Sequence, residues 1–389
     1  METSTRERTA ASATPVAVLA GGALLVLSQL YATIPLTAPV GAAFGGGNVS
    51  AALGTAFALA YAVGFLFFGP LSDHYGRLRV LVPGMAVLAL ATAALTVAPS
   101  LEVMALLRAV QGFAASCFAP IALAYLMEAL PPRRSAAAIG VMSTAFLVAG
   151  ILGQVYASSV ALAWGWEWVF GLAGAALAVV VVLMRTLLRE PSRDVAPGTL
   201  GGRFAQMARL LGRRRIVLPA VAHLGTLLAF VAMYSALGPH LGAEFGLDEG
   251  DIIWVRLAGL PGMLIAPYAG TLVARFGATR MAVAGFTLAA LGAGAEALAG
   301  GSLWLLTLTT VVFVAGIATV IPAMITLFGE RALPARAAGV ALNGFVLFAG
   351  ASLGPLVPLL GWGFGPLMLA LAGCLLVSAA LVLVSAPAE

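Results

Sequence analysis

Two short polar segments interrupt an otherwise apolar sequence and could carry chemistry. The first is the run Gly69-Pro-Leu-Ser-Asp73-His-Tyr-Gly76-Arg77-Leu-Arg79, which places an acid and two guanidinium groups around a glycine turn. The second is Arg108-Ala-Val-Gln111-Gly112, whose polar side chains lie three residues apart and so share one face of a helix. Charged groups in such patterns can form contacts that hold two elements together, or can bind a polar ligand.

Residues suited to covalent or metal chemistry are scattered along the sequence. Cys117 and Cys374 each lie inside an apolar run, so neither a disulfide framework nor a metal site is predicted. A membrane-embedded enzyme would need clustered His, Asp, Glu or Cys within its spans, and the apolar runs hold no such cluster. We therefore expect no enzymatic activity, no cofactor and no metal ion.

The composition requires a membrane environment. Of the 389 residues, 62% are hydrophobic and 9% are charged, whereas soluble chains carry roughly a quarter charged residues. Apolar runs long enough to cross a bilayer lie at 15–36, 50–70, 79–98, 102–126, 138–160, 166–187, 216–238, 252–273, 281–299, 303–328, 337–358 and 363–385. The predicted fold is an all-α membrane protein with twelve transmembrane helices in two pseudo-symmetric six-helix halves.

One long polar stretch separates the first six runs from the last six. It contains two prolines and a Gly-Gly pair, which are typical of a linker. We expect an N-terminal half at 1–187, a cytoplasmic linker at 188–215 and a C-terminal half at 216–389. A receptor would be expected to carry a soluble ligand-binding or signalling domain, and no segment is long enough for one.

The two halves repeat each other in sequence. GAAFG at 41–45 returns as GAEFG at 242–246, and the Gly69–Arg79 run returns as GTLVARFGATR at 270–280. The run FLVAGILGQV in the first half likewise matches LFAGASLGPL in the second. Parallel repeats of this kind place a substrate site between the halves near the bilayer midplane, and they transport by rocking one half against the other.

The arginines predict the orientation. All 20 basic residues are arginine, and with both termini inside, 18 fall in cytoplasmic segments and two, Arg108 and Arg256, within spans. The positive-inside rule then predicts a multi-pass protein of the cytoplasmic (inner) membrane with both termini cytoplasmic. Basic residues in short loops between spans suit anionic lipid headgroups of the bilayer, so nucleic acid is not expected as a partner.

The Gly69–Arg79 run resembles the signature loop between spans 2 and 3 of the major facilitator superfamily. The resemblance implies a gate built from Gly69, Asp73, Gly76, Arg77, Arg79 and Glu128. In this gate Asp73 faces a helix end of the other half, and the arginines find a carboxylate such as Glu128 at the end of span 4. The alternative is a charged turn that serves topology alone.

The Arg108–Gly112 run is similar to an Arg-x-x-Gln-Gly signature of proton-coupled members of the same superfamily. The resemblance implies that Arg108 and Gln111 face a central cavity, and the alternative is an arginine fixed by backbone carbonyls. In span 5, Gly150 and Gly153 match the drug/proton antiporter signature in part. Their small size predicts close packing against Gly259 and Gly262 of span 8, with a lipid-facing position as the alternative.

Few other polar side chains occur in the spans. The candidates for lining the cavity or binding protons are His223, Gln29, Tyr31, Tyr234, Gln154, Tyr156, Thr310 and Asn343. Each could equally form a helix-to-helix hydrogen bond. For Glu296, and likewise for Arg256, the expected position is the membrane interface, where the charged end reaches water.

These patterns predict a secondary transporter. The resemblance implies an efflux protein of the multidrug-resistance, antiporter type that exports a small organic compound in exchange for protons. The alternative is a sugar or amino-acid exporter or facilitator without proton coupling, which the lack of buried carboxylates in spans 1 to 8 favours. A sparsely polar cavity suits an amphipathic, uncharged or anionic substrate.

Overall fold

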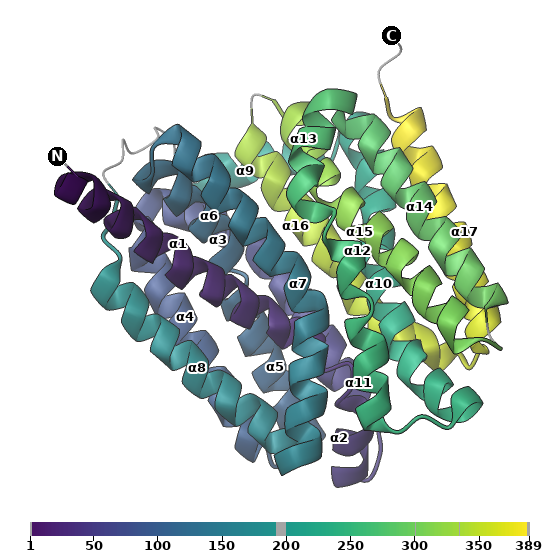
Figure 1. The fold of residues 1–389 in the computed structure, drawn as a ribbon. Coiled ribbons are helices and arrows are strands. Elements are labelled where there is room, and N and C mark those ends of the chain that lie inside the picture. The colour runs from purple at the N-terminus through teal and green to yellow at the C-terminus, as the bar shows by residue number, and fades with distance from the viewer. Residues whose placement is uncertain (1, 192–199, 300, 334, 387–389) are drawn as a thin grey trace.

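The computed structural model describes residues 2–191, 200–299, 301–333 and 335–386, and within these ranges it contains helices and no strand (Figure 1). The helices before the linker gather on one side of the molecule and those after it on the other. Their crossing segments agree closely with the twelve apolar runs of the sequence.

The first half is built from six crossing segments. Their helices are α1 (Glu2–Tyr31), η1 (Ala51–Thr55) continued by α3 (Ala56–Tyr75), α4 (Arg77–Ala94) with η2 (Leu95–Val97), α5 (Leu101–Ala115) with α6 (Phe118–Ala129), α7 (Pro132–Trp164) and α8 (Trp166–Leu187). The short helix α2 (Thr37–Ala43) joins the first two segments.

The second half follows α9 (Leu200–Leu210), which lies in the linker. Its helices are α10 (Arg214–Phe245), α11 (Glu249–Leu257), α12 (Leu260–Met263), α13 (Ala266–Phe276), α14 (Ala278–Leu298), α15 (Leu303–Arg331), α16 (Arg336–Leu353) with η3 (Gly354–Leu360), and α17 (Phe364–Val384). The short helix α2 lies at one end of the bundle, which we call the α2 end (Figure 1). We call the opposite end, where α3 ends and α4 begins at Arg77, the Arg77 end.

Eleven segments within the described residues are long and apolar enough to cross a membrane, and the eighth predicted span is the exception. It is divided into α11, α12 and α13. Pro261 and Pro267 lie at the starts of α12 and α13, and each lacks the backbone N–H that would continue the preceding helix. Tight turns join the pieces: the Gly262 N–H donates to the Gly259 carbonyl (3.1 Å) and the Leu264 N–H to the Pro261 carbonyl (3.1 Å). The predicted twelve-segment fold therefore consists of eleven continuous segments and one broken one.

Small residues allow close helix packing inside each half. A Cβ added at Gly285 of α14 would lie 2.9 Å from the backbone nitrogen of Val320 in α15, so these two helices touch through their backbones. Large apolar side chains such as Leu298 and Trp304 are exposed on the outside, as expected for a lipid-facing surface.

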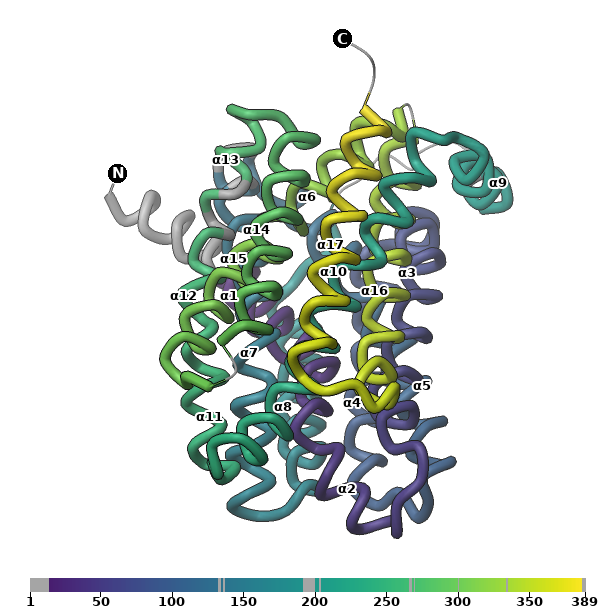
Figure 2. The backbone as a smooth tube through the Cα atoms, turned by 90° about the vertical axis from the view of Figure 1, so that its right-hand side faces the viewer, coloured from purple at the N-terminus to yellow at the C-terminus, as the bar shows by residue number. Residues whose placement is uncertain are grey.

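The halves meet along two pairs of helices, α3 with α16 and α7 with the broken α11–α13 segment (Figure 2). Between α3 and α16, the rings of Tyr61 and Phe348 lie 4.2 Å apart. Towards the α2 end, the Thr55 hydroxyl donates to the Ser352 carbonyl (2.7 Å). The linker helix α9 lies against α3, where the rings of Phe204 and Phe67 are 5.4 Å apart.

Candidate functional site

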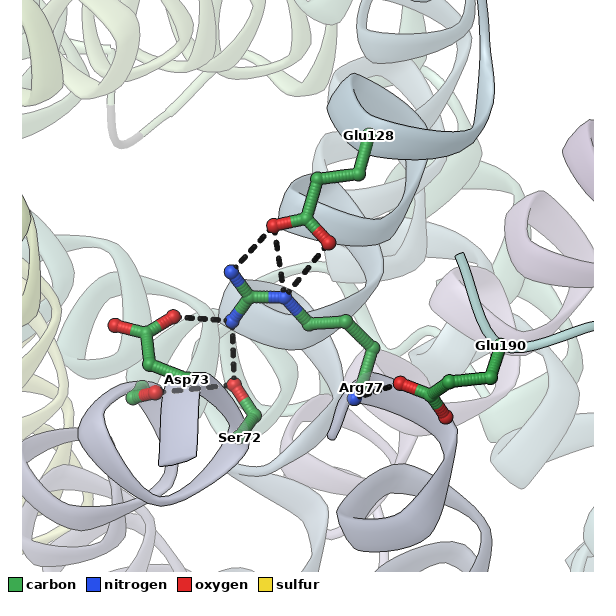
Figure 3. A network of polar contacts seen from close by, with 6 residues as sticks. Ser72, Asp73, Arg77, Glu128 and Glu190 are labelled. Atoms are coloured by element: carbon green, nitrogen blue, oxygen red, sulfur yellow. Dashed lines mark hydrogen bonds and ion pairs between the residues drawn. The ribbon is translucent and has the colours of Figure 1, made fainter. Parts of the chain in front are cut away.

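A network of ion pairs surrounds Arg77 at the first turn of α4 (Figure 3). Its Nη2 lies 2.6 Å from Oε1 of Glu128, at the end of α6, and its Nε lies 3.2 Å from both Glu128 oxygens. Its Nη1 donates to Asp73 and to the Ser72 hydroxyl (2.8 Å), both in the last turn of α3. One guanidinium thus ties together the ends of α3, α4 and α6.

Glu190, in the segment after α8, completes this network and is a residue that the sequence reasoning missed. Its two carboxylate oxygens accept the backbone N–H groups of Arg77 (2.5 Å) and Leu78 (2.9 Å), which are among the first four donors of α4 (Figure 3). A carboxylate at this position also complements the positive end of the helix dipole. Glu190 lies 113 residues from Arg77 in sequence, so no local pattern could indicate the contact.

The three remaining members of the predicted gate take different places. Gly76 has φ = 124°, a conformation that side chains other than glycine rarely adopt, and a Cβ there would lie 3.0 Å from Glu190. A Cβ added at Gly69 would meet no atom within 4 Å. Arg79 lines a lateral apolar groove between α3, α4 and α5.

Arg108 lies in α5 and is completely buried. Its Nε donates to the Leu53 carbonyl (2.7 Å) in the π-helical turn η1, and its Nη2 to the Gln29 carbonyl (3.0 Å) in α1. Its Nη1 donates to Oε1 of Gln111, and its guanidinium lies 4.3 Å from the ring centre of Phe57. The guanidinium thus holds three helical segments together.

This geometry corrects the expectation that Arg108 faces an open cavity. Its side chain is 0% exposed and is held by backbone carbonyls, which is the alternative stated for it above. Gln111 continues the buried network by donating to the Thr92 hydroxyl (2.8 Å) in α4 and to Oε1 of Gln29 (3.3 Å). Arg108, Gln111, Gln29 and Thr92 form a polar cluster inside the first half, here called the Arg108 cluster.

The other predicted span 1 and span 5 residues bond mainly within their own half. Gln154 donates to the Gly150 carbonyl (2.7 Å) one turn earlier, and the Tyr156 hydroxyl donates to the Val169 carbonyl (2.7 Å) of α8. Tyr31 differs, because its ring packs edge-on against Phe230 of α10, 5.6 Å away in the other half.

The candidates in the second half are all buried. The Nδ1 of His223 forms a hydrogen bond with the Thr226 hydroxyl (3.0 Å), while its Nε2 has no hydrogen-bond partner among the described residues. Thr310 donates to the Leu306 carbonyl (2.9 Å) of its own helix. Tyr234 and Asn343 are also buried, and the Tyr234 hydroxyl and the Asn343 Oδ1 have no partner within the same ranges.

Spans 5 and 8 are neighbours, but the four glycines do not all meet there. A Cβ at Gly259 would lie 3.0 Å from Ile151 of α7, and one at Gly150 would lie 3.4 Å from Met263 of α12. Gly153 instead packs on Ser28 in α1, and a Cβ there would lie 2.9 Å from the Ser28 Cα.

Gly262 faces α15, and a Cβ there would lie 3.0 Å from the Ala315 nitrogen. Gly150 and Gly259 thus lie at the boundary between halves, whereas Gly153 and Gly262 pack within their own halves.

Two further expectations are corrected by the burial of charged residues. Glu296, expected to reach the membrane interface, is 0% exposed near the end of α14. Arg256 is 3% exposed in α11, where its Nη1 donates to the Ser158 hydroxyl of α7 (2.6 Å) and lies 3.9 Å from Glu249. Sequence hydropathy could not distinguish the interface from the interior for either residue, because both lie close to span ends.

Comparison with known proteins agrees with this fold. The family profile described as Major Facilitator Superfamily matches residues 19–237, which is more than half of the chain. The Inner membrane transport protein YnfM of Escherichia coli K12 is 26% identical over 261 residues, covering 65% of this chain and 62% of that protein. Multidrug resistance protein 3 of Bacillus subtilis is 25% identical over 179 residues, covering 44% of this chain and 33% of its own length.

Two solved structures have the same fold. A bacterial homologue of the human lysosomal transporter Spinster, in an inward-facing and unoccupied conformation, aligns with a TM-score of 0.74 and 17% identity, over 96% of this chain and 97% of that one. The human organic anion transporter MFSD10 aligns with a TM-score of 0.69 and 17% identity, over 95% and 99% of the respective chains.

Proposed function

This chain belongs to the Major Facilitator Superfamily, and we propose that it exports a small organic compound across the cytoplasmic membrane in exchange for protons. The observation that carries transport by movement of one half is the pairing of two arginine-centred contacts within that half; export in exchange for protons rests on the resemblance of the Arg108–Gly112 run to proton-coupled members of the superfamily. The Arg77 network holds the ends of three helices, and the Arg108 cluster fixes three more helical segments towards the centre.

These contacts support transport by movement of one half against the other. Because the Arg77 network and the Arg108 cluster lie inside the first half, that half can move as one body. Near the α2 end the two halves are joined by contacts that include the hydrogen bonds from Thr55 to Ser352 and from Arg256 to Ser158. Breaking these bonds would open the α2 end, which we assign to the outside of the cell because the basic segments gather at the Arg77 end.

The chemistry of the boundary favours an amphipathic organic substrate. Aromatic rings meet across it, including Tyr31 with Phe230 and Tyr61 with Phe348, while polar side chains are few. Such a surface offers stacking and apolar contacts but cannot pair the many hydroxyls of a sugar. The relatives named for multidrug resistance and the structural neighbour named for organic anions support the same substrate class.

The test is transport by the purified protein in liposomes. Vesicles carrying a pH gradient are loaded with each compound of a panel of amphipathic neutral and anionic molecules, and efflux is compared with that after collapse of the gradient by a protonophore. Acceleration by the gradient for at least one compound supports the proposal. If the efflux rate of every transported compound is the same with and without the pH gradient, the protein is a transporter without proton coupling.

The alternative function is a facilitator or exporter of a sugar or amino acid without proton coupling. It is favoured by one observation: the Arg108 cluster holds its charge with backbone carbonyls and amide side chains and includes no carboxylate. A sugar and amino-acid panel under the same conditions distinguishes the two proposals.

A further inference from the structure

The second half contains a buried acid that the arrangement above does not use. Glu296 lies two residues before the end of α14 and is 0% exposed. Neither of its carboxylate oxygens has a hydrogen-bond partner among the described residues. The Thr310 hydroxyl of α15 donates to the Leu306 carbonyl (2.9 Å), and it lies close enough to the Glu296 carboxyl to interact with it as well.

Two more polar groups in the same region are also unsatisfied. The Tyr234 hydroxyl of α10 lies against the turn after α11, because a Cβ added at Gly259 would clash with it. One turn further along α10, a Cβ added at Gly238 would lie 3.1 Å from Nη2 of Arg256, so Tyr234 and Arg256 are neighbours, and Tyr234 is near enough to Glu296 to interact with its charge. That hydroxyl and the Arg256 Nε lack hydrogen-bond partners in the described ranges, as do both Glu296 oxygens. We call Glu296, Tyr234 and Arg256 the Glu296 cluster.

A carboxylate in this position cannot remain charged without a partner. Burying an isolated charge in an apolar interior costs more free energy than protonating the group. The unpaired carboxyl is therefore held as the neutral acid. Within the described ranges Arg256 makes no ion pair with Glu296; its Nη1 donates to Ser158 (2.6 Å) and lies 3.9 Å from Glu249. Intramembrane acids of this kind are found on proton pathways.

The helices around Glu296 contribute few other charges. Helix α10 contributes the Tyr234 hydroxyl, and α11 contributes the Arg256 guanidinium. The sequence of α17 contains no charged residue or histidine, and the basic residue of α13, Arg275, lies in its last turn at the Arg77 end. The charged residues of α15, Glu330 and Arg331, lie in its last turn at the Arg77 end. The titratable groups on this side of α14 are therefore Glu296, Tyr234 and Arg256 with its neighbour Glu249.

We propose that Glu296 is the proton-binding site of the transporter, and that Tyr234 transmits its charge state to Arg256 and so to the contact with Ser158. With the proton bound, Arg256 is free to bond Ser158 and the α2 end is closed, as in this structure. When the O–H bond of the acid breaks and the proton leaves to water, the carboxylate draws Tyr234 and Arg256 towards α14. The bond to Ser158 then weakens and the α2 end opens.

This inference rests on the proposed proton exchange but can be tested without a substrate. Infrared difference spectra of the lipid-reconstituted protein, recorded during a pH titration, should show a protonated carboxyl band that disappears on raising the pH. The band should be lost in Glu296→Gln and retained in Glu244→Gln, which removes an exposed acid from the same half. If Glu296→Gln does not fold, Glu296→Asp should shift the frequency of the band.

The link to the α2 end needs a second readout. Spin labels at Ala43 and Ala243, exposed positions in the repeated GAAFG and GAEFG segments, report the separation of the halves at that end. Raising the pH should populate a longer distance in the parent protein. Glu296→Gln should abolish this shift, and Tyr234→Phe should reduce it while keeping the infrared band.

The outcomes separate this inference from the proposed function. A titrating band that survives in Glu296→Gln, or a distance shift that survives there, overturns the assignment of Glu296 even if liposomes show proton-driven efflux. A band that disappears in Glu296→Gln while no compound responds to a pH gradient supports the proton site and overturns the proposed exchange. Pyranine-loaded vesicles record any proton movement in the same preparations.

Discussion

Replacement of Arg108 by methionine should destabilise the protein. Methionine keeps most of the length and apolar stem of the side chain. It removes the three guanidinium N–H donors, which now bond the Leu53 carbonyl, the Gln29 carbonyl and the Gln111 side chain. Two backbone carbonyls, one in η1 and one in α1, would then be buried without their present partner. The structure therefore predicts a loss of stability as well as of transport.

The magnitude follows from the number and kind of hydrogen bonds that the methionine variant cannot form. At the average value for helix-to-helix hydrogen bonds in membranes, about 0.6 kcal/mol, the two bonds to carbonyls are worth about 1 kcal/mol. At the value for bonds with a charged partner, about 1.5 to 3 kcal/mol each, they are worth about 3 to 6 kcal/mol. Removing the buried charge regains part of this, so we expect the free energy of unfolding to fall by about 2 to 4 kcal/mol.

Two variants serve as comparisons. Arg108→Lys keeps the charge but has no planar fork, so it can reach one carbonyl at a time and should lose about half as much stability. Arg275→Met removes another arginine that lies over an aromatic ring, 5.2 Å from the centre of Phe276, but at an exposed position. It should change stability by less than about 0.5 kcal/mol.

The assay is unfolding in mixed micelles by increasing fractions of denaturing detergent, followed by tryptophan fluorescence. A loss below about 0.5 kcal/mol for Arg108→Met would refute the reasoning, since surface substitutions have effects of that size. It would mean that the two carbonyls find other donors, and that the guanidinium contributes nothing to holding α1, η1 and α5 together.

Three further predictions concern the Arg77 end and the orientation. Glu190→Gln should weaken the cap of α4 by about 1 kcal/mol, and hydrogen exchange at the first two amides of that helix should accelerate; unchanged exchange would contradict the assignment. Asp73→Asn keeps the shape but removes one charge beside the guanidinium, so liposome transport should fall while expression remains; normal transport would leave the turn with a topological role only. Reporter fusions at Gly45, Glu102 and Gly246 should all be found outside the cell, and one cytoplasmic result would reverse the orientation.

The fold followed from the sequence because hydropathy is a local property. A run such as 166–187 needs only its own residues to be recognised, and the structure has α8 over the same residues. The broken eighth segment could not be predicted so directly. Its prolines were visible, but prolines such as Pro219 and Pro322 lie inside continuous helices, so the outcome depends on the neighbours that satisfy the freed carbonyls.

The candidate site was predictable in part. The spacing of Arg108 and Gln111 was sufficient to place them together, and the structure has them in contact. Their partners were not visible, because the Leu53 and Gln29 carbonyls are backbone atoms of distant segments and carry no residue-type signal. The same holds for Glu296, whose depth is set by the helices that pack around α14.

The division of the eighth segment has a consequence for biogenesis. A helix enters the bilayer from the translocon according to its summed insertion energy, in which each central Asp or Arg costs about 2.5 to 3.5 kcal/mol. The α11–α13 segment begins with Glu249 and Asp251, contains Arg256 and is interrupted by two prolines, so it is a weak insertion signal on its own. We expect this segment to remain beside α10 at the translocon and to insert only after α14 and α15 have been synthesised and can pack against it. The helices of the second half would then insert together rather than one at a time.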